Sequence, residues 1–330
     1  MKKFLVVLAI GLLTASLAFA GATEEADDDE IIIGFNNGST TVDFLRLVGE
    51  SMVREAENYG VKLLVAESNF DPEKILPNVD NLLLQGADII VDFNVNAEIG
   101  GSLVDYCGEK GVSVIGIDVA YTGVNGDQAW FFGANNQMAG YVAGEGLAAE
   151  IKDRWDGEIE QALFFHNSEN GPVVRLRMSG MVDGMRDNGI TITDDMIEWI
   201  EMGGGGSDTT LVANQKMTDW LTAHPDLTKI VIGTVNSETG QGVFSAAQAQ
   251  NRDADCLLAT NNNGNQAIAA MEMGDNMWLG GTAYYPNRYG EYIIPLAISI
   301  VNGENPDKMQ TMEHVFLTRK DLDEIKANAQ

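Results

Sequence analysis

The sequence predicts an α/β protein of two lobes, each a doubly wound parallel sheet with helices on both faces. From residue 31 onward, short apolar runs alternate with helical patterns. The runs at 89–91 and 112–117 show the type, because each stops at a carboxylate, Asp92 or Asp118. Continuous apolar runs of this length are typical of buried parallel strands. A chain of 330 residues also exceeds what one compact core usually holds, so two lobes are expected.

Residues 1–20 have the pattern of a secretory signal peptide. Lys2 and Lys3 precede an apolar core, and small residues lead up to Ala20. We therefore expect export, with cleavage after Ala20. The residue directly after the cleavage point is Gly21, not a cysteine that could carry a lipid. We therefore expect a soluble exported protein with no further membrane span.

The chain is strongly acidic, with a formal net charge of −29. Such a chain repels nucleic acid, and we expect no nucleic-acid partner. Residues 21–30 are rich in acids and are expected to form a solvated leader before the first strand. A cation-binding tail is the alternative, but no ligand spacing or glycine turn accompanies the acids. We expect neither a metal nor a cofactor.

The first lobe is expected to alternate strands with helices. The strands are predicted at residues 31–35, 61–66, 89–91 and 112–117, and the helices at 42–59, from 71 onward and at 99–110. Gly60 and Gly111 stop two of these helices. Asp71 and Pro72 open the other one as cap and first residue. Loops this short between alternating elements imply a parallel sheet.

An edge strand at 129–134 is expected to lead the chain into a second lobe of the same kind. The strands of that lobe are predicted at 161–165, 197–202, 229–234 and 256–260, and its helices at 136–152, 173–187, 208–223, 238–249 and 266–273. A strand at 277–284, a helix at 288–302, an apolar piece at 315–317 and a helix at 320–327 follow. The glycine-rich loop at 203–206 lacks the following lysine of a phosphate-binding loop, so no nucleotide site is expected there.

The two cysteines, Cys107 and Cys256, are expected to remain unpaired. Cys107 falls in the middle of a predicted helix, and Cys256 falls at the start of a much later strand. A disulfide in an oxidising compartment is the alternative. We favour buried free thiols.

Asp118 is the first candidate for a functional site. It is a carboxylate at the end of a buried strand, where apolar surroundings disfavour a charge. In parallel α/β sheets, ligands bind at the carboxyl ends of the strands. The alternative is that Asp118 caps a helix in the segment that follows it.

Six passages together carry a resemblance to a known family. They read QGADII at 85–90, GVSVIGID at 111–118, FGANN at 132–136 with Gly140, VRLR at 174–177 with Gly180, AHPD at 223–226 and NSE at 236–238. In this order and spacing, residues 31–330 resemble the periplasmic sugar-binding proteins of ABC transporters, of the ribose- and galactose-binding type. That family shares its fold with the lactose-repressor regulators.

The resemblance implies two lobes joined by three crossover strands, near Ala134, Tyr284 and Val315, with a ligand cleft between the lobes. The lobes would consist of residues 31–133 plus 285–314 and of residues 134–284 plus 315–330. Closure about this hinge would trap a small sugar or polyol in the periplasm. The membrane permease of an ABC importer would recognise the closed form.

The resemblance also implies ligand-binding roles for polar residues at strand ends. Asp118 matches an aspartate that accepts hydrogen bonds from sugar hydroxyls. Arg175 matches a second-lobe arginine, whose planar fork can donate to two adjacent hydroxyls. Asn236 and Asn261 match further polar positions of the second lobe. Val119 stands where ribose-binding members have an arginine, which argues against ribose itself.

Aromatic residues are expected beside these polar groups, because sugar rings pack their C–H faces on aromatic faces. Phe44 matches a stacking aromatic of the family, and Phe93 and Tyr284 fall at other strand or loop ends. Three polar residues are candidates of second rank: Asp43, Asn94 and His166. Arg177, two residues beyond Arg175, is expected to be a surface arginine.

An enzyme is the competing class, but the sequence contains few of the motifs that an enzyme would need. The chain has no G-x-S-x-G elbow, no paired-histidine metal motif and no G-x-G-x-x-G after the first strand, and only His166 is expected near the cleft. A DNA-binding regulator would need a helix-turn-helix before the first strand, where the signal peptide and leader stand. We therefore expect a non-catalytic binder, with a secreted α/β enzyme acting on carbohydrate as a weaker alternative.

A second alternative shares the fold but not the partner. A sensor protein would present its ligand, for example a signal sugar such as autoinducer-2, to a membrane chemoreceptor or sensor kinase. Transport and sensing use the same closed form, so the sequence leaves both open.

Overall fold

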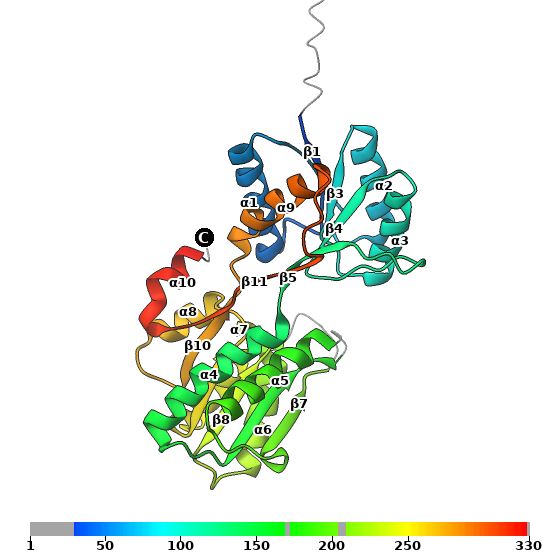
Figure 1. The fold of residues 1–330 in the computed structure, drawn as a ribbon. Coiled ribbons are helices and arrows are strands. Elements are labelled where there is room, and N and C mark those ends of the chain that lie inside the picture. The colour runs from blue at the N-terminus through cyan, green and yellow to red at the C-terminus, as the bar shows by residue number, and fades with distance from the viewer. Residues whose placement is uncertain (1–29, 169–171, 204–208, 329–330) are drawn as a thin grey trace, which may run out of the picture.

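The computed structural model describes residues 30–168, 172–203 and 209–328. The expected signal peptide, the leader up to residue 29 and most of the glycine-rich loop lie outside these ranges. Two six-stranded sheets form, each with helices on both faces (Figure 1), so the two-lobed α/β prediction is confirmed. Across the described ranges, every helix is too short or too polar to cross a bilayer.

The first sheet is parallel throughout, in the order β11-β5-β4-β3-β1-β2. Its strands are β1 (Ile32–Asn37), β2 (Lys62–Glu67), β3 (Ile89–Asp92), β4 (Ser113–Ile117), β5 (Trp130–Ala134) and β11 (Met309–Met312). Helices α1 (Asp43–Tyr59) and α9 (Gly290–Val301) pack together on one face. Helices α2 (Pro72–Leu84) and α3 (Ala97–Gly108) cover the other face.

The second sheet has the order β12-β10-β9-β8-β6-β7. Its strands are β6 (Gln161–His166), β7 (Ile197–Glu201), β8 (Ile230–Thr234), β9 (Cys256–Thr260), β10 (Trp278–Ala283) and β12 (Val315–Thr318). Helices α4 (Asn136–Trp155) and α5 (Pro172–Asp187) pack on one face. The other face carries α6 (Thr209–Ala223), α7 (Ser237–Ala249), α8 (Asn265–Glu272) and α10 (Leu322–Asn328).

Two strands differ from the prediction. β11 was not expected, because its sequence MQTM forms no apolar run and half of it is exposed. By pairing with β5, it makes β5 an interior strand where we expected an edge. β12 runs antiparallel to β10. Only Glu313 and His314 separate β12 from the first sheet, so β12 enters the second sheet at the end where β10 leaves it and must run the opposite way.

The chain passes between the sheets three times, close to the expected positions. The first crossover leads from β5 through Asn135 into α4. The second leaves β10 through Tyr284 and Tyr285 toward α9, and the third joins β11 to β12 through Glu313 and His314. The exact division of the chain into lobes at these points stays a prediction.

Helices α4 and α5 cross with their backbones in contact. Gly140 and Gly144 of α4 face Gly180 and Gly184 of α5, and a Cβ atom at Gly140 would lie 1.8 Å from the carbonyl oxygen of Arg177. At each of the other three positions, the nearest backbone oxygen would lie 2.2 Å from an added Cβ. Such distances exclude a side chain, so the crossing requires glycine at all four positions. It thereby sets the position of the first turns of α5 against α4.

Both cysteines are buried and unpaired, which confirms the prediction. Cys107 lies in α3, and Cys256 begins β9. Burial raises the pKa of each thiol to about 12. Neither side chain therefore supplies a reactive thiolate at neutral pH.

Candidate functional site

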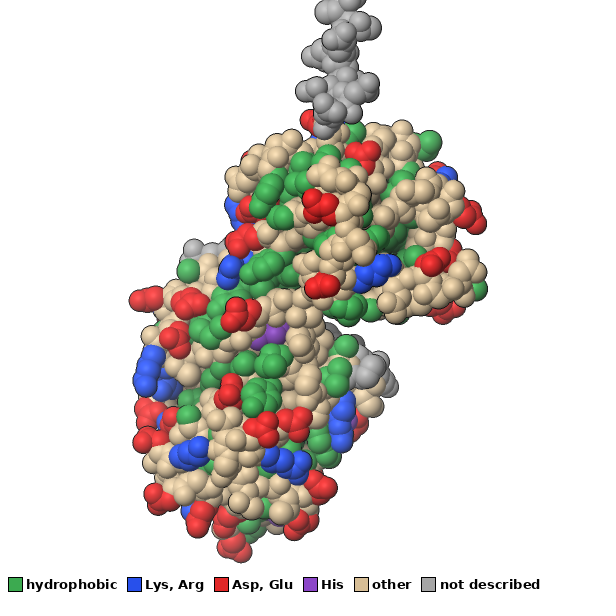
Figure 2. Space-filling model, in the orientation of Figure 1, with side chains coloured by type: hydrophobic (Ala, Val, Ile, Leu, Met, Phe, Trp, Pro, Cys, Tyr) green, Lys and Arg blue, Asp and Glu red, His purple; other side chains and the backbone are tan. Residues whose placement is uncertain are grey.

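Polar and aromatic side chains gather where the three crossovers meet. Asp118, which follows β4, accepts a hydrogen bond from the Tyr289 hydroxyl. Tyr284 contacts Asn261 and, in the third crossover, His314. We call this set the hinge cluster: Asp118, Arg177, Asn261, Tyr284, Tyr289 and His314. The surface is notched between the two lobes (Figure 2).

Asp118 adopts a left-handed backbone conformation, with φ of 59°. Its Oδ1 accepts hydrogen bonds from the Ala134 backbone N–H at 2.9 Å and from the Tyr289 hydroxyl at 3.0 Å. The structure contains no helix between β4 and β5, where every residue is described, so the alternative of a helix cap is wrong. Oδ2 has no hydrogen-bond partner among the described residues and is the atom left to accept from a ligand.

The electrostatic setting of Asp118 is mixed. Burial raises the pKa of this carboxyl above its usual value, against the lowering effects of the Ala134 N–H, the Tyr289 hydroxyl and the charge of Arg177. The pKa is raised because the loss of hydration on burial destabilises the charged carboxylate more than these three groups stabilise it. Ligand hydroxyls that donate to Oδ2 would replace part of the hydrogen bonding to water that the carboxylate loses on burial.

The two predicted aromatic residues of the first lobe differ in burial. Phe44 is half-buried and packs edge-on against Tyr289, with ring centroids 5.7 Å apart. Phe93 is 3% exposed and belongs to the core beneath Phe44. Asp43, beside Phe44, is exposed and pairs with Arg46 of its own helix. Of these three candidates, Phe44 is the one in contact with the hinge cluster.

Asn94 belongs to a buried network around the carboxylate of Asp92. From the sequence, Asp92 was expected at the end of a strand but not as a candidate site residue. The Asn94 Nδ2 donates to Asp92, and its Oδ1 accepts from the Asn96 N–H at 2.7 Å. Asp92 also accepts from Asn36 Nδ2 at 2.6 Å and from the Tyr121 hydroxyl at 3.0 Å. Burial raises the pKa of Asp92, while these three donors lower it. Both ends of the Asn94 amide are thus engaged within the protein, which favours support of the strand ends over direct ligand contact.

The two predicted asparagines of the second lobe lie at neighbouring strand ends. Asn236 caps α7, because its Oδ1 accepts from the backbone N–H of Thr239 at 2.9 Å and from its hydroxyl at 2.7 Å. Asn261 is 2% exposed, and its Oδ1 lies 3.4 Å from the Tyr284 hydroxyl. Asn261 therefore joins the hinge cluster. Asn236 is half-buried, and its amide nitrogen makes no hydrogen bond to the described residues.

His166 and Arg175 lie together at the β7 edge of the second sheet. The Arg175 guanidinium stacks 3.2 Å from the ring centroid of Trp199, and the His166 ring meets the same indole edge-on at 5.8 Å. His166 Nδ1 is 3.7 Å from a carboxylate oxygen of Glu201. Burial and the charge of Arg175 lower the pKa of His166, whereas Glu201 raises it. Neither residue shows a contact with Asp118.

Arg177 is the functional candidate that the sequence missed. We expected a surface arginine, but it is half-buried, and its Nε donates to Asn136 Oδ1 at 2.7 Å. Its guanidinium carbon lies 5.2 Å from the ring centroid of Tyr284, and its charge lowers the pKa of Asp118. Gly180 was an available signal, because a glycine three positions further along α5 marks the face that packs against α4.

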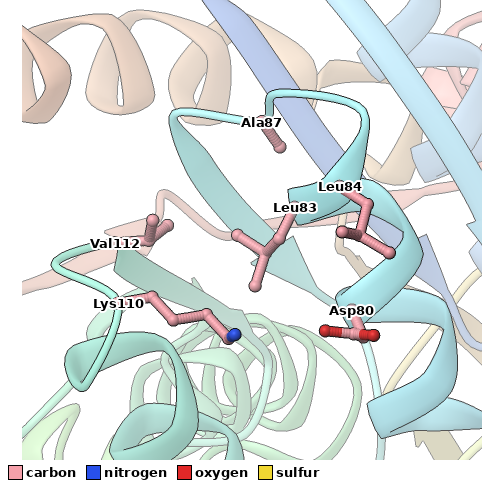
Figure 3. Close-up of a pocket in the computed structure, with 6 residues that line it drawn as sticks. All are labelled: Asp80, Leu83, Leu84, Ala87, Lys110 and Val112. Atoms are coloured by element: carbon pink, nitrogen blue, oxygen red, sulfur yellow. The ribbon is translucent and has the colours of Figure 1, made fainter.

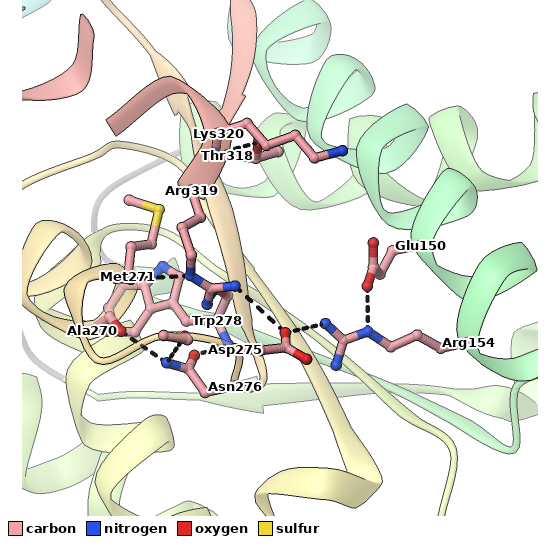
Figure 4. A network of polar contacts seen from close by, with 11 residues as sticks. Glu150, Arg154, Ala270, Met271, Asp275, Asn276, Trp278, Thr318, Arg319 and Lys320 are labelled. Atoms are coloured by element: carbon pink, nitrogen blue, oxygen red, sulfur yellow. Dashed lines mark hydrogen bonds and ion pairs between the residues drawn. The ribbon is translucent and has the colours of Figure 1, made fainter. Parts of the chain in front are cut away.

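Two shallow pockets lie at the amino-terminal ends of strands, away from the hinge cluster. The first, of about 240 Å³ (Figure 3), is lined by Asp80, Leu83, Leu84, Ala87, Lys110 and Val112. The second, of about 340 Å³, adjoins a surface network in which Arg154 and Arg319 share Asp275 (Figure 4). Neither pocket contains a predicted ligand-binding residue.

A metal centre finds no support in the part of the chain that the structure describes. There, no three histidine, cysteine, aspartate or glutamate side chains are grouped so as to hold an ion. The hinge cluster offers both hydrogen-bond donors and acceptors, and it contains one negative and one positive side chain. This combination suits an uncharged polar ligand.

Comparison with known proteins gives one family. The family model described as "Periplasmic binding protein domain" matches residues 33–305. The ribose import binding protein RbsB of Salmonella typhimurium is 22% identical over 304 residues, which cover 92% of this chain and 94% of that protein. RbsB of Bacillus subtilis is 23% identical over 316 residues, covering 93% and 96%.

Solved structures agree on the fold. An ABC transporter solute binding protein from Bacillus halodurans, with bound myo-inositol, superposes with a TM-score of 0.69 at 18% identity, covering 92% of this chain and 99% of that one. Another from Mycobacterium smegmatis, with bound glycerol, gives a TM-score of 0.68 at 20% identity, covering 89% and 96%. At these identities, the likeness concerns the fold.

Proposed function

The chain belongs to the periplasmic binding protein family, and from that premise we propose that it captures a small sugar or polyol between its lobes and delivers it to the permease of an ABC importer. The observation that carries the proposal is the hinge cluster. There the carboxylate of Asp118, from the first sheet, and the guanidinium of Arg177, from α5 of the second lobe, flank the same crossovers.

In this proposal, residues 31–133 plus 285–314 and residues 134–284 plus 315–330 close on each other about the three crossovers. The mature chain starts after Ala20 and works in the periplasm. Closure brings the strand ends of both sheets around one molecule and excludes water from it. The permease then recognises the closed form.

The chemistry of the site suits a neutral polyhydroxylated ligand. Asp118 Oδ2 accepts from hydroxyl groups, Arg177 donates to them, and the ring of Phe44 covers an apolar C–H face. A carboxylate and a guanidinium together leave little net charge for an ionic ligand to neutralise. The relatives named for ribose import and the solved structures with bound glycerol and myo-inositol support this class of ligand. Val119 beside Asp118 still argues against ribose itself.

A binding role is favoured over catalysis. The described partners of Asp118 are a backbone N–H and a tyrosine hydroxyl, neither of which acts as the second carboxylate that an acid and base pair would need. His166, the histidine expected near the cleft, lies apart with Arg175 and Trp199. A sensor that presents the same ligand to a membrane receptor remains the second candidate, because the same closed form would serve it.

A thermal-shift screen of the purified mature chain tests the ligand class. The panel contains neutral sugars and polyols, including D-allose, D-ribose, myo-inositol and glycerol, with nucleosides and amino acids as the contrasting set. We expect at least one sugar or polyol to raise the melting temperature, because a molecule that binds the folded state alone stabilises it by mass action. A shift confined to nucleosides or amino acids would overturn the proposed ligand class.

Substitution of the two arginines tests which one serves the site. We expect Arg177→Ala to weaken binding of the best panel compound by about 10- to 100-fold, because a hydrogen bond to a charged group contributes about 1.5–3 kcal/mol. Arg175→Ala is the matched control, since it removes the same side chain from the same helix, and the described contact of Arg175 is its stacking on Trp199. We expect it to cost less than about tenfold in affinity. Calorimetric titration of both variants gives the ranking, and the reverse ranking would return the role to Arg175.

A further inference from the structure

His314 connects all three crossovers through one imidazole ring. It lies in the third crossover and is 5% exposed. Its Nε2 accepts from the backbone N–H of Asn135, in the first crossover, at 3.1 Å. Its Nδ1 lies 3.1 Å from the carbonyl oxygen of Ala283, where the second crossover begins. The ring also packs on Tyr284, with centroids 4.9 Å apart.

These two backbone partners determine the tautomer. The Asn135 N–H can only donate, so Nε2 must be unprotonated, and the Ala283 carbonyl can only accept, so Nδ1 must carry the hydrogen. The neutral ring satisfies both groups. A second proton, on Nε2, would point at the Asn135 N–H and break that bond.

Asp118 binds the same crossover one residue earlier. The N–H groups of Ala134 and Asn135 are consecutive, and they donate to Asp118 Oδ1 and to His314 Nε2 respectively. Asp118 Oδ1 also accepts from Tyr289, which follows the second crossover. Ala134 and Tyr289 thus orient the Asp118 carboxylate. Asp118 and His314 together hold the backbone of the first crossover at two consecutive residues.

We propose that neutral His314 is a positioning residue for ligand capture: it holds the three crossovers in the arrangement that lets Asp118 and Arg177 meet one ligand, and protonation of its ring releases the first crossover. The proposal rests on the proposed binding function. It goes beyond that function by making capture dependent on pH.

The groups around the ring support the neutral form. Burial lowers the pKa of His314 from 6.5, the Ala283 carbonyl raises it, and the charge of Arg177, on α5, lowers it further. Tyr284 contributes an uncharged face at neutral pH, since burial raises its own pKa. Asp118 is bound to the neighbouring Ala134 N–H, and Glu313, on the same segment, is exposed.

The sign of the pH effect follows from the lowered pKa. Above pH 6.5 the ring is neutral whether the chain is folded or unfolded, and the arrangement is intact. As the pH falls below 6.5, the unfolded state takes up the proton before the folded state does, so the arrangement loses stability progressively. Affinity for a neutral ligand depends on the protonation of the folded, unliganded protein, so it falls as the pH drops through the lowered folded-state pKa of His314, by at most about tenfold per pH unit if one proton must leave for capture.

The first test needs no ligand. Hydrogen exchange of the Asn135 amide is measured on the unliganded full mature chain from pH 7.5 to pH 5.0, and each rate is corrected for the intrinsic pH dependence of exchange. We expect protection of this amide to decrease toward pH 5.0 in the wild type and to be low at every pH in His314→Asn, which lacks the Nε2 acceptor. Wild-type protection that is unchanged across this range would overturn the proposal.

The second test uses calorimetric titration with myo-inositol and D-allose, neither of which ionises in this range. We expect wild-type affinity to fall toward pH 5.0 and the affinity of His314→Gln to fall less, because only the ionisation of Asp118 then contributes to the pH dependence. His166→Gln is the control, because it removes the other histidine of lowered pKa and should keep the wild-type slope. A slope in His314→Gln equal to that of the wild type contradicts the role of His314. If neither compound binds at any pH, the proposed ligands are wrong and the exchange measurement still decides the role of His314.

Discussion

Asp118→Asn is expected to abolish ligand-induced stabilisation while leaving the unliganded protein at least as stable as the wild type at pH 7. The amide keeps an oxygen in the place of Oδ1, so the bonds from Ala134 and Tyr289 are preserved. Asparagine also tolerates the left-handed conformation at this position better than most residues do. The ligand, however, loses the charged acceptor Oδ2 and meets an amide donor instead. At about 1.5–3 kcal/mol for each hydrogen bond to the carboxylate, affinity should fall at least about 10- to 100-fold.

The stability of the unliganded protein should respond in the opposite direction. Because burial raises the pKa of Asp118 in the folded state, ionisation of this group costs stability as the pH rises from about 4, the usual aspartate range, through the folded-state pKa. The neutral amide removes that cost, so the variant should lack this contribution to the pH dependence. Urea unfolding between pH 3 and pH 8, with and without the best panel compound, measures both effects.

Tyr289→Phe is the matched control for this experiment. It removes one of the two donors to Oδ1 and leaves the charge of Asp118 and its free oxygen in place. We expect a modest loss of stability, of about 1 kcal/mol, and retention of ligand-induced stabilisation. If Asp118→Asn bound as tightly as the wild type, the carboxylate would serve the hinge alone and the ligand would be held elsewhere.

Gly140→Ala is expected to destabilise the second lobe by about 2–4 kcal/mol. The new Cβ would lie 1.8 Å from the Arg177 carbonyl oxygen and 3.0 Å from the Met181 nitrogen. These atoms belong to the backbone of α5, which cannot turn aside as a side chain can, so the two helices must separate. Because Arg177 is the residue displaced, ligand affinity should fall as well. The free energy of unfolding from urea titration gives the first effect, and calorimetric titration gives the second.

Gly108→Ala is the control for the glycine substitution. Gly108 is the last residue of α3, it is exposed, and an added Cβ would meet no atom within 4 Å. There alanine should stabilise the protein slightly, by about 0.5–1 kcal/mol, because it reduces the freedom of the unfolded chain. Equal effects at the two glycines would mean that the close approach of α4 and α5 does not exist in solution.

The site could be predicted in part because strand ends are visible in the sequence. Asp118 was found as a carboxylate that ends an apolar run, and Asn261 was found at the corresponding place after β9. The arginine was placed two positions away from the one that meets the hinge cluster. Residues two apart on a helix point in nearly opposite directions, so choosing between Arg175 and Arg177 required knowing which face of α5 packs against α4. In the local sequence, only Gly180 indicates which face of α5 packs against α4, and a glycine alone does not show that Arg177 lies near that face.

Other parts of the site depend on partners that are far apart along the chain. Tyr289 donates to Asp118 across 171 positions, and Asn135 donates to His314 across 179. No periodicity or capping signal extends over such distances. The short strand β11 escaped prediction for a related reason: its residues have little apolar character of their own, and pairing with β5 makes them a strand.

The sequence by itself determined the α/β class, the alternation of strands and helices, the free cysteines and the place of the Asp118 carboxylate at a strand end, because these follow from apolar periodicity, glycine and proline positions and the residues that end each apolar run. Tertiary structure alone decided which arginine joins the hinge cluster, that Asn94 and Asp92 support the strand ends, and that His314 links the three crossovers. The physical reason is that burial and hydrogen-bond partners at a crossover belong to segments that only the folded chain brings together.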